Sequence, residues 1–106
     1  MSARFAYFYF MADDPRRVQT LAPQHVAHWQ GLNLLGYSGG PFADRSGGLI
    51  TFIVDEPAKA EAAVAADPFV RENLLARFWL KRWDRAEPDA AGSRGPVSRA
   101  QEWRGA

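Results

Sequence analysis

The 106-residue sequence contains 47% hydrophobic and 24% charged residues, a composition that fits one folded domain with a hydrophobic core. Thirteen Lys and Arg residues nearly balance twelve Asp and Glu residues, and the net charge of +1 makes nucleic acid and membrane surfaces poor candidates as partners. The absence of cysteine excludes disulfide bonds, thiolate nucleophiles and cysteine-ligated metals. No long apolar run occurs and no signal-peptide pattern opens the chain, so we expect a cytoplasmic protein without membrane contact.

The first predicted element is a strand at residues 4–11, where aromatic residues dominate and no turn-forming residue interrupts them. Successive side chains of a strand point to opposite faces. One face therefore carries Phe5, Tyr7, Tyr9 and Met11, and the other carries Ala6, Phe8 and Phe10. Both faces are apolar, although one layer of helices covers only one of them. We expect a second copy of the chain to cover the other face, which predicts a homodimer.

A helix is predicted from Pro23 to Leu35. Residues 13–20 before it are polar and irregular, proline is favoured in a first helical turn, and Gly36 is a typical residue just past a helix end. Along this helix His25 shares one face with apolar residues, because the spacing follows the helical repeat.

Two strands at residues 37–42 and 49–54 follow, joined by turn-forming residues, and they are expected to form a hairpin. A second helix at residues 58–66 has Asp55 as its expected N-cap. This helix should end before Pro68, because a residue that precedes proline is disfavoured in the α conformation.

The chain continues with one helical turn at residues 69–74, closed by Asn73 in a left-handed conformation, and with a last strand at residues 76–83. This order predicts an α+β fold of the ferredoxin-like βαββαβ type, with an antiparallel sheet and both helices on one face. We assign this domain to residues 1–83. Residues 84–106 are polar and rich in Pro and Gly, and we expect this tail to dock on its own or the partner subunit.

Two polar residues on predicted buried faces are the candidates for chemistry. His25 carries an imidazole, the side chain best suited to exchange protons near neutral pH. Asp67 follows Ala60 and Val64 at helical spacing, which places a carboxylate on the buried side of the second helix. Each has a structural alternative, His25 as a hydrogen-bonded core residue and Asp67 as a cap of the turn at Pro68. Since both helices cover the same sheet face, an Asp–His pair that orients the imidazole is feasible.

The remaining motifs favour structural roles. His28 lies three residues from His25, but zinc sites on one helix typically use histidines four residues apart and need a third ligand, so we predict no metal. The glycines before Pro41 lack the strand-to-helix context of a phosphate loop. The tyrosines of the first strand are expected to pack in the sheet, with pocket lining as the alternative.

Several short motifs follow one another along the sequence with a specific order and spacing. His25 stands eleven residues before Gly36, and the further motifs are Gly39-Gly40-Pro41-Phe42-Ala43-Asp44, Gly47-Gly48-Leu49-Ile50 and Ala65-Ala66-Asp67-Pro68-Phe69-Val70. Over residues 5–83 this pattern resembles the YCII-related (YciI-like) family. The resemblance implies a ferredoxin-like fold assembled as a dimeric α+β barrel and an active site built on His25 and Asp67. The family includes a dehydrochlorinase of aromatic degradation and is similar to muconolactone-isomerase-like barrels, which implies a lyase or an isomerase.

We therefore predict an enzyme of lyase or isomerase type that uses no cofactor and acts on a small organic substrate, with aromatic and polyketide-like molecules as the candidates. The predicted catalytic residues are His25 and Asp67, and the predicted substrate-binding residues are Trp29, Gly40, Pro41 and Phe42. One alternative is a non-catalytic small-molecule-binding or accessory dimer. Another is an RNA-recognition domain, which shares the order of elements but is disfavoured by the nearly neutral charge.

Overall fold

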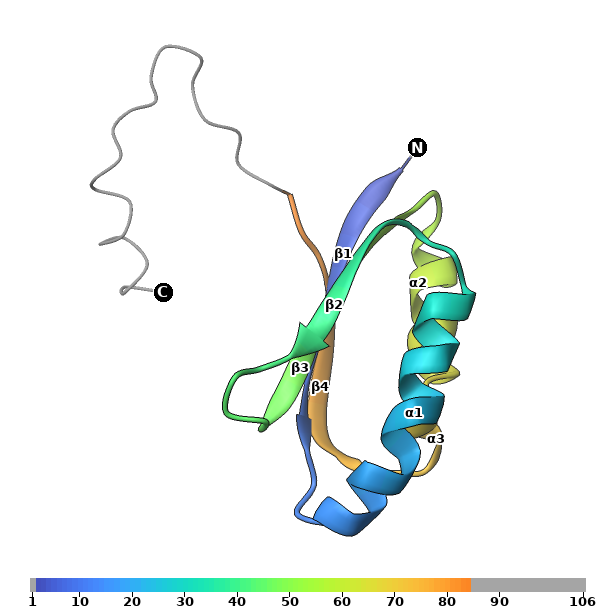
Figure 1. Ribbon diagram of the computed structural model, residues 1–106. Coiled ribbons are helices and arrows are strands. Elements are labelled where there is room, and N and C mark those ends of the chain that lie inside the picture. The colour runs from blue at the N-terminus through green and yellow to red at the C-terminus, as the bar shows by residue number, and fades with distance from the viewer. Residues whose placement is uncertain (1, 85–106) are drawn as a thin grey trace, which may run out of the picture.

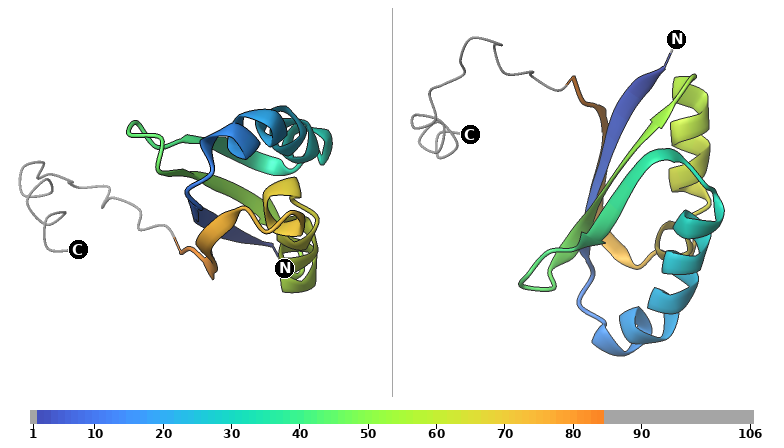
Figure 2. Two further views of the ribbon diagram at one scale, coloured as in Figure 1. Left: turned by 90° about the horizontal axis from the view of Figure 1, so that it is seen from below. Right: turned by 45° about the horizontal axis from the view of Figure 1, so that its top comes forward.

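The computed structural model describes residues 2–84, so the predicted tail lies, apart from Asp84, outside the described residues. The elements are β1 (Ala3–Met11), α1 (Pro15–Gly31), β2 (Leu35–Pro41), β3 (Gly47–Val54), α2 (Pro57–Ala65), α3 (Pro68–Arg71) and β4 (Leu75–Arg82). The strands form one antiparallel sheet in the order β2-β3-β1-β4. All three helices lie on one face of this sheet (Figures 1 and 2). The predicted α+β fold with a ferredoxin-like order of elements is confirmed.

Helix α1 starts eight residues earlier than the sequence predicted, and the expected start at Pro23 is wrong. Asp14 is the N-cap, with a side chain that accepts a hydrogen bond from the Arg17 N–H at 3.3 Å, and Pro15 occupies the first turn. Pro23 lies inside the helix. A proline fixes φ at a helical value and removes only one hydrogen bond, so a helix that is well capped upstream can continue through it.

The end of α1 also differs from the prediction. The helix stops at Gly31, and Asn33, with φ of 51°, is the residue that turns the chain in the left-handed conformation. Gly36 has φ of 63° but lies within β2, where the register against β3 is irregular. Leu35, expected as the last helical residue, is the first residue of β2. Among the non-glycine residues, asparagine is one of those that most often adopt positive φ, so Asn33 can turn the chain before Gly36 is reached.

The second half of the chain follows the prediction closely. Helix α2 has Glu56 rather than Asp55 at its N-cap, and the Asp55 carboxylate instead pairs with Lys59 at 2.9 Å. The chain then makes the single helical turn α3, and Asn73 has the expected positive φ of 58°.

The core lies between the sheet and the helices, and β1 and β3 are the two central strands, because each pairs with a neighbour on both sides. The buried apolar side chains are Phe5, Tyr7, Tyr9, Trp29, Ile50, Phe52, Val54, Ala60, Ala63, Val64, Phe69 and Leu74. Two adjacent glycines of β3 allow close packing here. A Cβ atom at Gly47 would overlap the Tyr9 carbonyl oxygen, and one at Gly48 would overlap the Tyr9 hydroxyl. Any larger residue at these two positions would therefore displace Tyr9.

Within residues 2–84, no helix covers the opposite face of the sheet (Figure 1). Aromatic side chains lie on this face. Phe8 stacks on Trp79 with ring centroids 5.2 Å apart, and Phe10 contacts Phe42 with centroids 5.6 Å apart. Trp79 and Leu49 keep 37% and 39% of their surfaces exposed. We call the residues Phe8, Phe10, Phe42, Leu49 and Trp79 the outer sheet face. Within residues 2–84, no helix has the length and apolar character needed to cross a membrane.

The internal proline of α1 gives a test of this description. Replacing Pro23 with alanine restores an N–H that can bond to the Gln19 carbonyl, and Pro23 is exposed, so no packing is lost. We expect Pro23→Ala to raise the free energy of unfolding by about 1 to 2 kcal/mol, after allowing for the greater freedom of the unfolded chain. Urea unfolding measures this change, with Gln24→Ala as the matched control that stays within about 0.5 kcal/mol. A loss of stability in Pro23→Ala would contradict a helix that runs through this residue.

Candidate active site

A fully buried carboxylate lies at the junction of α2 and α3. Asp67 has no exposed surface and is the N-cap of α3, where its Oδ1 accepts a hydrogen bond from the Phe69 N–H at 2.8 Å. Aspartate before proline is favoured at such a cap, because Pro68 holds the first helical φ and directs the next N–H back to the carboxylate. The capping role that the sequence allowed is therefore present.

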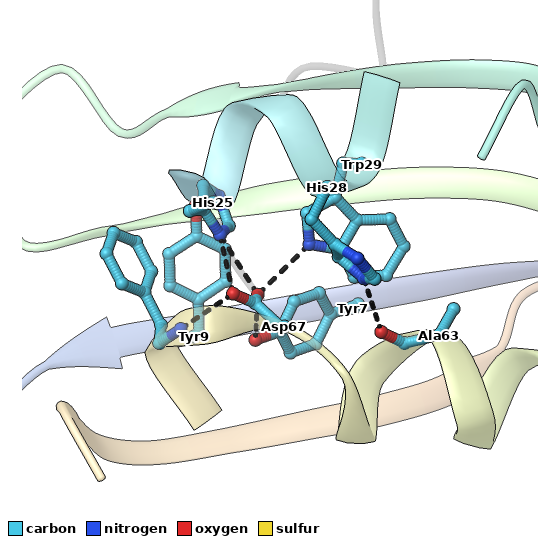
Figure 3. Close-up of polar contacts among 8 residues, drawn as sticks. Tyr7, Tyr9, His25, His28, Trp29, Ala63 and Asp67 are labelled. Atoms are coloured by element: carbon cyan, nitrogen blue, oxygen red, sulfur yellow. Dashed lines mark hydrogen bonds and ion pairs between the residues drawn. The ribbon is translucent and has the colours of Figure 1, made fainter. Parts of the chain in front are cut away.

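Three further side chains reach this carboxylate from β1 and α1 (Figure 3). The Tyr7 hydroxyl and the Trp29 Nε1–H each donate to Oδ2 at 3.0 Å. His25 Nδ1 lies 2.9 Å from Oδ1 and 3.0 Å from Oδ2. His25 and Trp29 are four residues apart on α1 and therefore share the face that looks toward Asp67. The structure thus brings the two predicted catalytic residues into contact.

The donors around Asp67 determine its charge. Burial alone would raise the pKa of the Asp67 carboxyl, but hydrogen bonding and charge attraction from His25, with the N–H groups of Trp29 and Phe69, hold that pKa below its usual range. Burial and the nearby Asp67 charge raise the pKa of Tyr7 far above its usual value, so its hydroxyl keeps the proton that it donates. Asp67 is therefore an anion at neutral pH, surrounded by donors that replace water.

The contact with Asp67 sets the orientation of His25. A carboxylate only accepts hydrogen bonds, so the neutral imidazole carries its proton on Nδ1 and leaves a lone pair on Nε2. The Tyr9 hydroxyl lies 3.2 Å from Nε2, and the imidazole stacks on the Phe69 ring with centroids 4.2 Å apart. Burial, together with the charge of Asp67, raises the pKa of Tyr9 to about 12, so Tyr9 is the donor to Nε2. Asp67, His25 and Tyr9 form a continuous hydrogen-bonded chain.

This series of hydrogen bonds ends at a cavity of about 390 Å³ between α1 and the β2–β3 hairpin. His25 and Tyr9 line it, together with mostly apolar or uncharged residues, which are Met11, Val18, Ala22, Val26, Gln30, Tyr37, Gly39, Gly40, Pro41, Arg45, Gly47, Ile50 and Phe69. The volume lies within the range of small-molecule sites.

The four residues predicted to bind substrate fall in three places. Gly40 and Pro41 line the cavity. Trp29 does not line it: its side chain is 1% exposed and lies behind the imidazole, where its indole N–H contacts Asp67. Phe42 packs against Phe10 on the outer sheet face. Trp29 therefore supports the carboxylate from inside the core.

Sequence reasoning treated the two tyrosines of β1 mainly as packing residues, and the structure places their hydroxyls on Asp67 and His25. The sequence did contain a signal for this role, because the two tyrosines lie two residues apart and therefore on the same, helix-facing side of the strand. His28, the second histidine, bonds to the Ala63 carbonyl at 2.9 Å and so joins α1 to α2. Among residues 2–84, no group of three His, Asp or Glu side chains is arranged to hold a metal ion.

Comparisons with known proteins support the fold. No family model matches the chain, and no curated protein matches it. A solved structure that is similar is 5-chloro-2-hydroxyhydroquinone dehydrochlorinase from Burkholderia phenoliruptrix AC1100 in complex with 2,5-dihydroxybenzoquinone, with a TM-score of 0.69 and 18% sequence identity. The alignment covers 78% of this chain and 95% of that chain. This neighbour has the dimeric α+β barrel fold, which agrees with the predicted fold class.

The crowding of donors around Asp67 predicts the effect of Asp67→Asn. An amide has one acceptor oxygen, so either orientation places its NH₂ group against Trp29 Nε1–H or against Phe69 N–H. Such a clash leaves a buried donor unpaired, and we expect the free energy of unfolding to fall by about 2 to 4 kcal/mol at pH 7. Urea unfolding measures the loss, and the exposed Asp13→Asn is the control. Equal losses in the two variants would contradict this account.

The same variant should change the acid response. Because folding lowers the pKa of Asp67, its stabilising contribution is complete above about pH 4, the usual value for an unfolded chain, and is lost as the pH falls further. The stability of Asp67→Asn should therefore fall less than that of the wild type between pH 5 and acid conditions.

Proposed function

We propose that the chain is a member of the YCII-related family and an enzyme of lyase or isomerase type that moves a proton on a small aromatic substrate. This proposal rests on the series of hydrogen bonds that runs from buried Asp67 through His25 to Tyr9. His25 and Tyr9 line a largely apolar cavity of about 390 Å³. A buried carboxylate that orients an imidazole beside such a cavity is the usual arrangement for general acid–base catalysis.

Each of the hydrogen-bonded residues has a distinct role in this proposal. The Nε2 atom of His25 takes the proton, either directly from the substrate or through the Tyr9 hydroxyl, which lies 3.2 Å away. Asp67 holds the Nδ1 proton and stabilises the imidazolium that forms, so it is a positioning residue. Tyr7 and Trp29 hold the carboxylate in place.

The reaction class needs no external oxidant. The neighbour in the structure comparison is named as a dehydrochlorinase of a chlorinated hydroxyhydroquinone. Net loss of HCl from such a ring gives a hydroxybenzoquinone. One O–H proton is transferred to the carbon that bears chlorine, a second O–H proton is released, and chloride leaves with the electron pair of the C–Cl bond, while the two O–H electron pairs are kept in the C=O groups of the product. The change is therefore redox-neutral with respect to the enzyme, and an imidazole that accepts a proton and returns one beside an apolar cavity suits it.

Two hydroxyhydroquinones test the proposal under anaerobic conditions. With 5-chloro-2-hydroxyhydroquinone the readout is chloride release, and with the chlorine-free 2-hydroxyhydroquinone it is exchange of ring protons for deuterium, followed by NMR. We expect the wild-type protein to accelerate at least one of these reactions. His25→Asn keeps an N–H toward Asp67 but removes Nε2, and it should lower the rate by about a hundred- to ten-thousand-fold.

The control is His28→Asn, because the His28 ring bonds to the Ala63 carbonyl, away from Asp67, and does not line the cavity. This variant should keep the wild-type rate. If both probes bind at the cavity but neither reaction is faster than without protein, the second candidate, a non-catalytic binding dimer, replaces the enzyme.

We also propose that the protein is a homodimer that buries the outer sheet face of both copies. Aromatic side chains such as Trp79, 37% exposed in the single chain, are costly to leave in water over a contiguous patch. Phe8 lies near the middle of this face, opposite Leu49 on β3 and Trp79 on β4.

A charge at the centre of this face should separate the copies. We expect Phe8→Glu to convert a dimer into a folded monomer, because a carboxylate would be buried against the partner without a donor. Sedimentation equilibrium measures the mass. Ala27→Glu, on the exposed side of α1, should leave the dimer intact. A wild-type monomer at high micromolar concentration would contradict the proposal.

A further inference from the structure

One cation stands at the boundary between the cavity and the open surface. Arg45, in the connection between β2 and β3, lines the cavity and also lines a wider groove of about 1150 Å³ beside it. The cavity and the groove also share Met11, Val18 and Ala22, so they adjoin each other. A molecule that enters the cavity from this groove passes Arg45.

The charges around the cavity favour an anion. Among the described residues that line the cavity, Arg45 is the one with a permanent charge, and neither Asp nor Glu lines it. His25, Tyr9 and Tyr37 are the other titratable side chains in its wall. The negative charge of Asp67 lies behind the imidazole, paired with its own donors. Within residues 2–84, no hydrogen bond or ion pair engages the Arg45 guanidinium, whereas the Arg77 guanidinium lies 5.1 Å over the Phe10 ring. Arg45 is therefore available to a ligand.

The backbone at this position would suit glycine better. Arg45 has φ of 66°, a left-handed conformation that costs a non-glycine residue roughly 1 kcal/mol. The turn that imposes it is well ordered by hydrogen bonds: the Arg45 N–H donates to the Phe42 carbonyl at 2.9 Å, and the Asp44 carboxylate accepts from the Ser46 hydroxyl at 2.7 Å. The arginine side chain thus stands at a position where stability alone would favour a different residue.

We propose that Arg45 binds an anionic group of the substrate at the mouth of the cavity, while the aromatic body of the substrate lies inside against the apolar wall and His25. The ligand class is a small aromatic anion, a carboxylate or an ionised hydroxyl on a ring. The inference rests on the proposed function in assigning its substrate to the same cavity. A guanidinium suits this task because its planar N–H groups match the oxygens of a carboxylate.

A pair of ligands of nearly equal shape isolates the charge. The probes are 4-hydroxybenzoate, an anion, and 4-hydroxybenzamide, its neutral counterpart, and the readout is the amide NMR shift of cavity residues such as Gly40 and Gly47. We expect the wild-type protein to bind the anion about tenfold more tightly than the amide, which corresponds to about 1.4 kcal/mol. In Arg45→Gln the two dissociation constants should become equal within about twofold. Higher salt should weaken only binding of the anion to the wild type.

Two further variants make the test decisive. Arg71→Gln removes an exposed arginine of α3 that lines neither the cavity nor the groove, and it should keep the tenfold preference. Arg45→Gly should lose the preference and yet raise the melting temperature, because glycine adopts positive φ without strain. A preference that survives in Arg45→Gln, equal binding of the two probes by the wild type, or the absence of saturable shifts at cavity residues would each overturn the inference.

The outcome for Arg45 is separable from that for catalysis. Binding of the two probes does not require turnover, so the preference for the anion should persist in His25→Asn. If that preference depends on Arg45 while no reaction is accelerated, the anion site stands and the enzyme proposal fails. If a reaction is accelerated but Arg45→Gln leaves the preference unchanged, only the assignment of Arg45 fails.

Discussion

A carboxylate can be buried only where hydrogen-bond donors replace the water it has lost, and Asp67 imposes this requirement on the whole domain. Its donors come from β1, from two positions of α1 and from the first turn of α3. The sheet and two helices must therefore meet at one point with correct geometry. Packing of apolar side chains supplies most of the stabilisation of such a fold, but it leaves the relative positions of helices loosely defined. The carboxylate supplies the missing specificity, as buried polar networks do when every member has a partner.

The same interaction makes one of the donors chemically different from the others. Tyr7, Trp29 and the Phe69 N–H each direct their donor group at Asp67, and none of these contacts prepares a second group for proton transfer. His25 has a second ring nitrogen, and the contact at Nδ1 directs this nitrogen toward Tyr9 and the cavity. Folding and the preparation of a base are thus achieved by one set of contacts. No separate movement is needed to orient the imidazole.

Local signals in the sequence were sufficient for most of the fold. They made a pair of His25 and Asp67 feasible but left a capping role for Asp67 also open, and it was the family resemblance that implied the pair. The alternation of aromatic residues in β1 and the Asp-Pro pair at residue 67 act over a few residues, and the structure agrees with both. The start of α1 differs from the prediction because Pro23 resembles a first-turn proline, whereas Asp14-Pro15 is the stronger local start signal, with a capping carboxylate directly before the proline. The hydroxyl of Tyr7 meets Asp67 across 60 residues of sequence, a contact that no local pattern encodes. The positive φ of Arg45, by contrast, arises in a local turn held by hydrogen bonds among residues 42–46, although arginine is not a residue that signals this conformation.

The closeness of Gly48 to the Tyr9 hydroxyl has a consequence for mutational tolerance. A position without a side chain, and with no part in proton transfer, decides whether the phenol can lie beside the imidazole. Substitutions at Gly48 should therefore be as damaging to activity as substitutions at the reactive residues, although Gly48 contributes no functional group and acts only by leaving room for the Tyr9 hydroxyl. A comparison of related sequences that looks only for reactive side chains would miss this position, whereas one that also asks how large a side chain each position can hold would identify it.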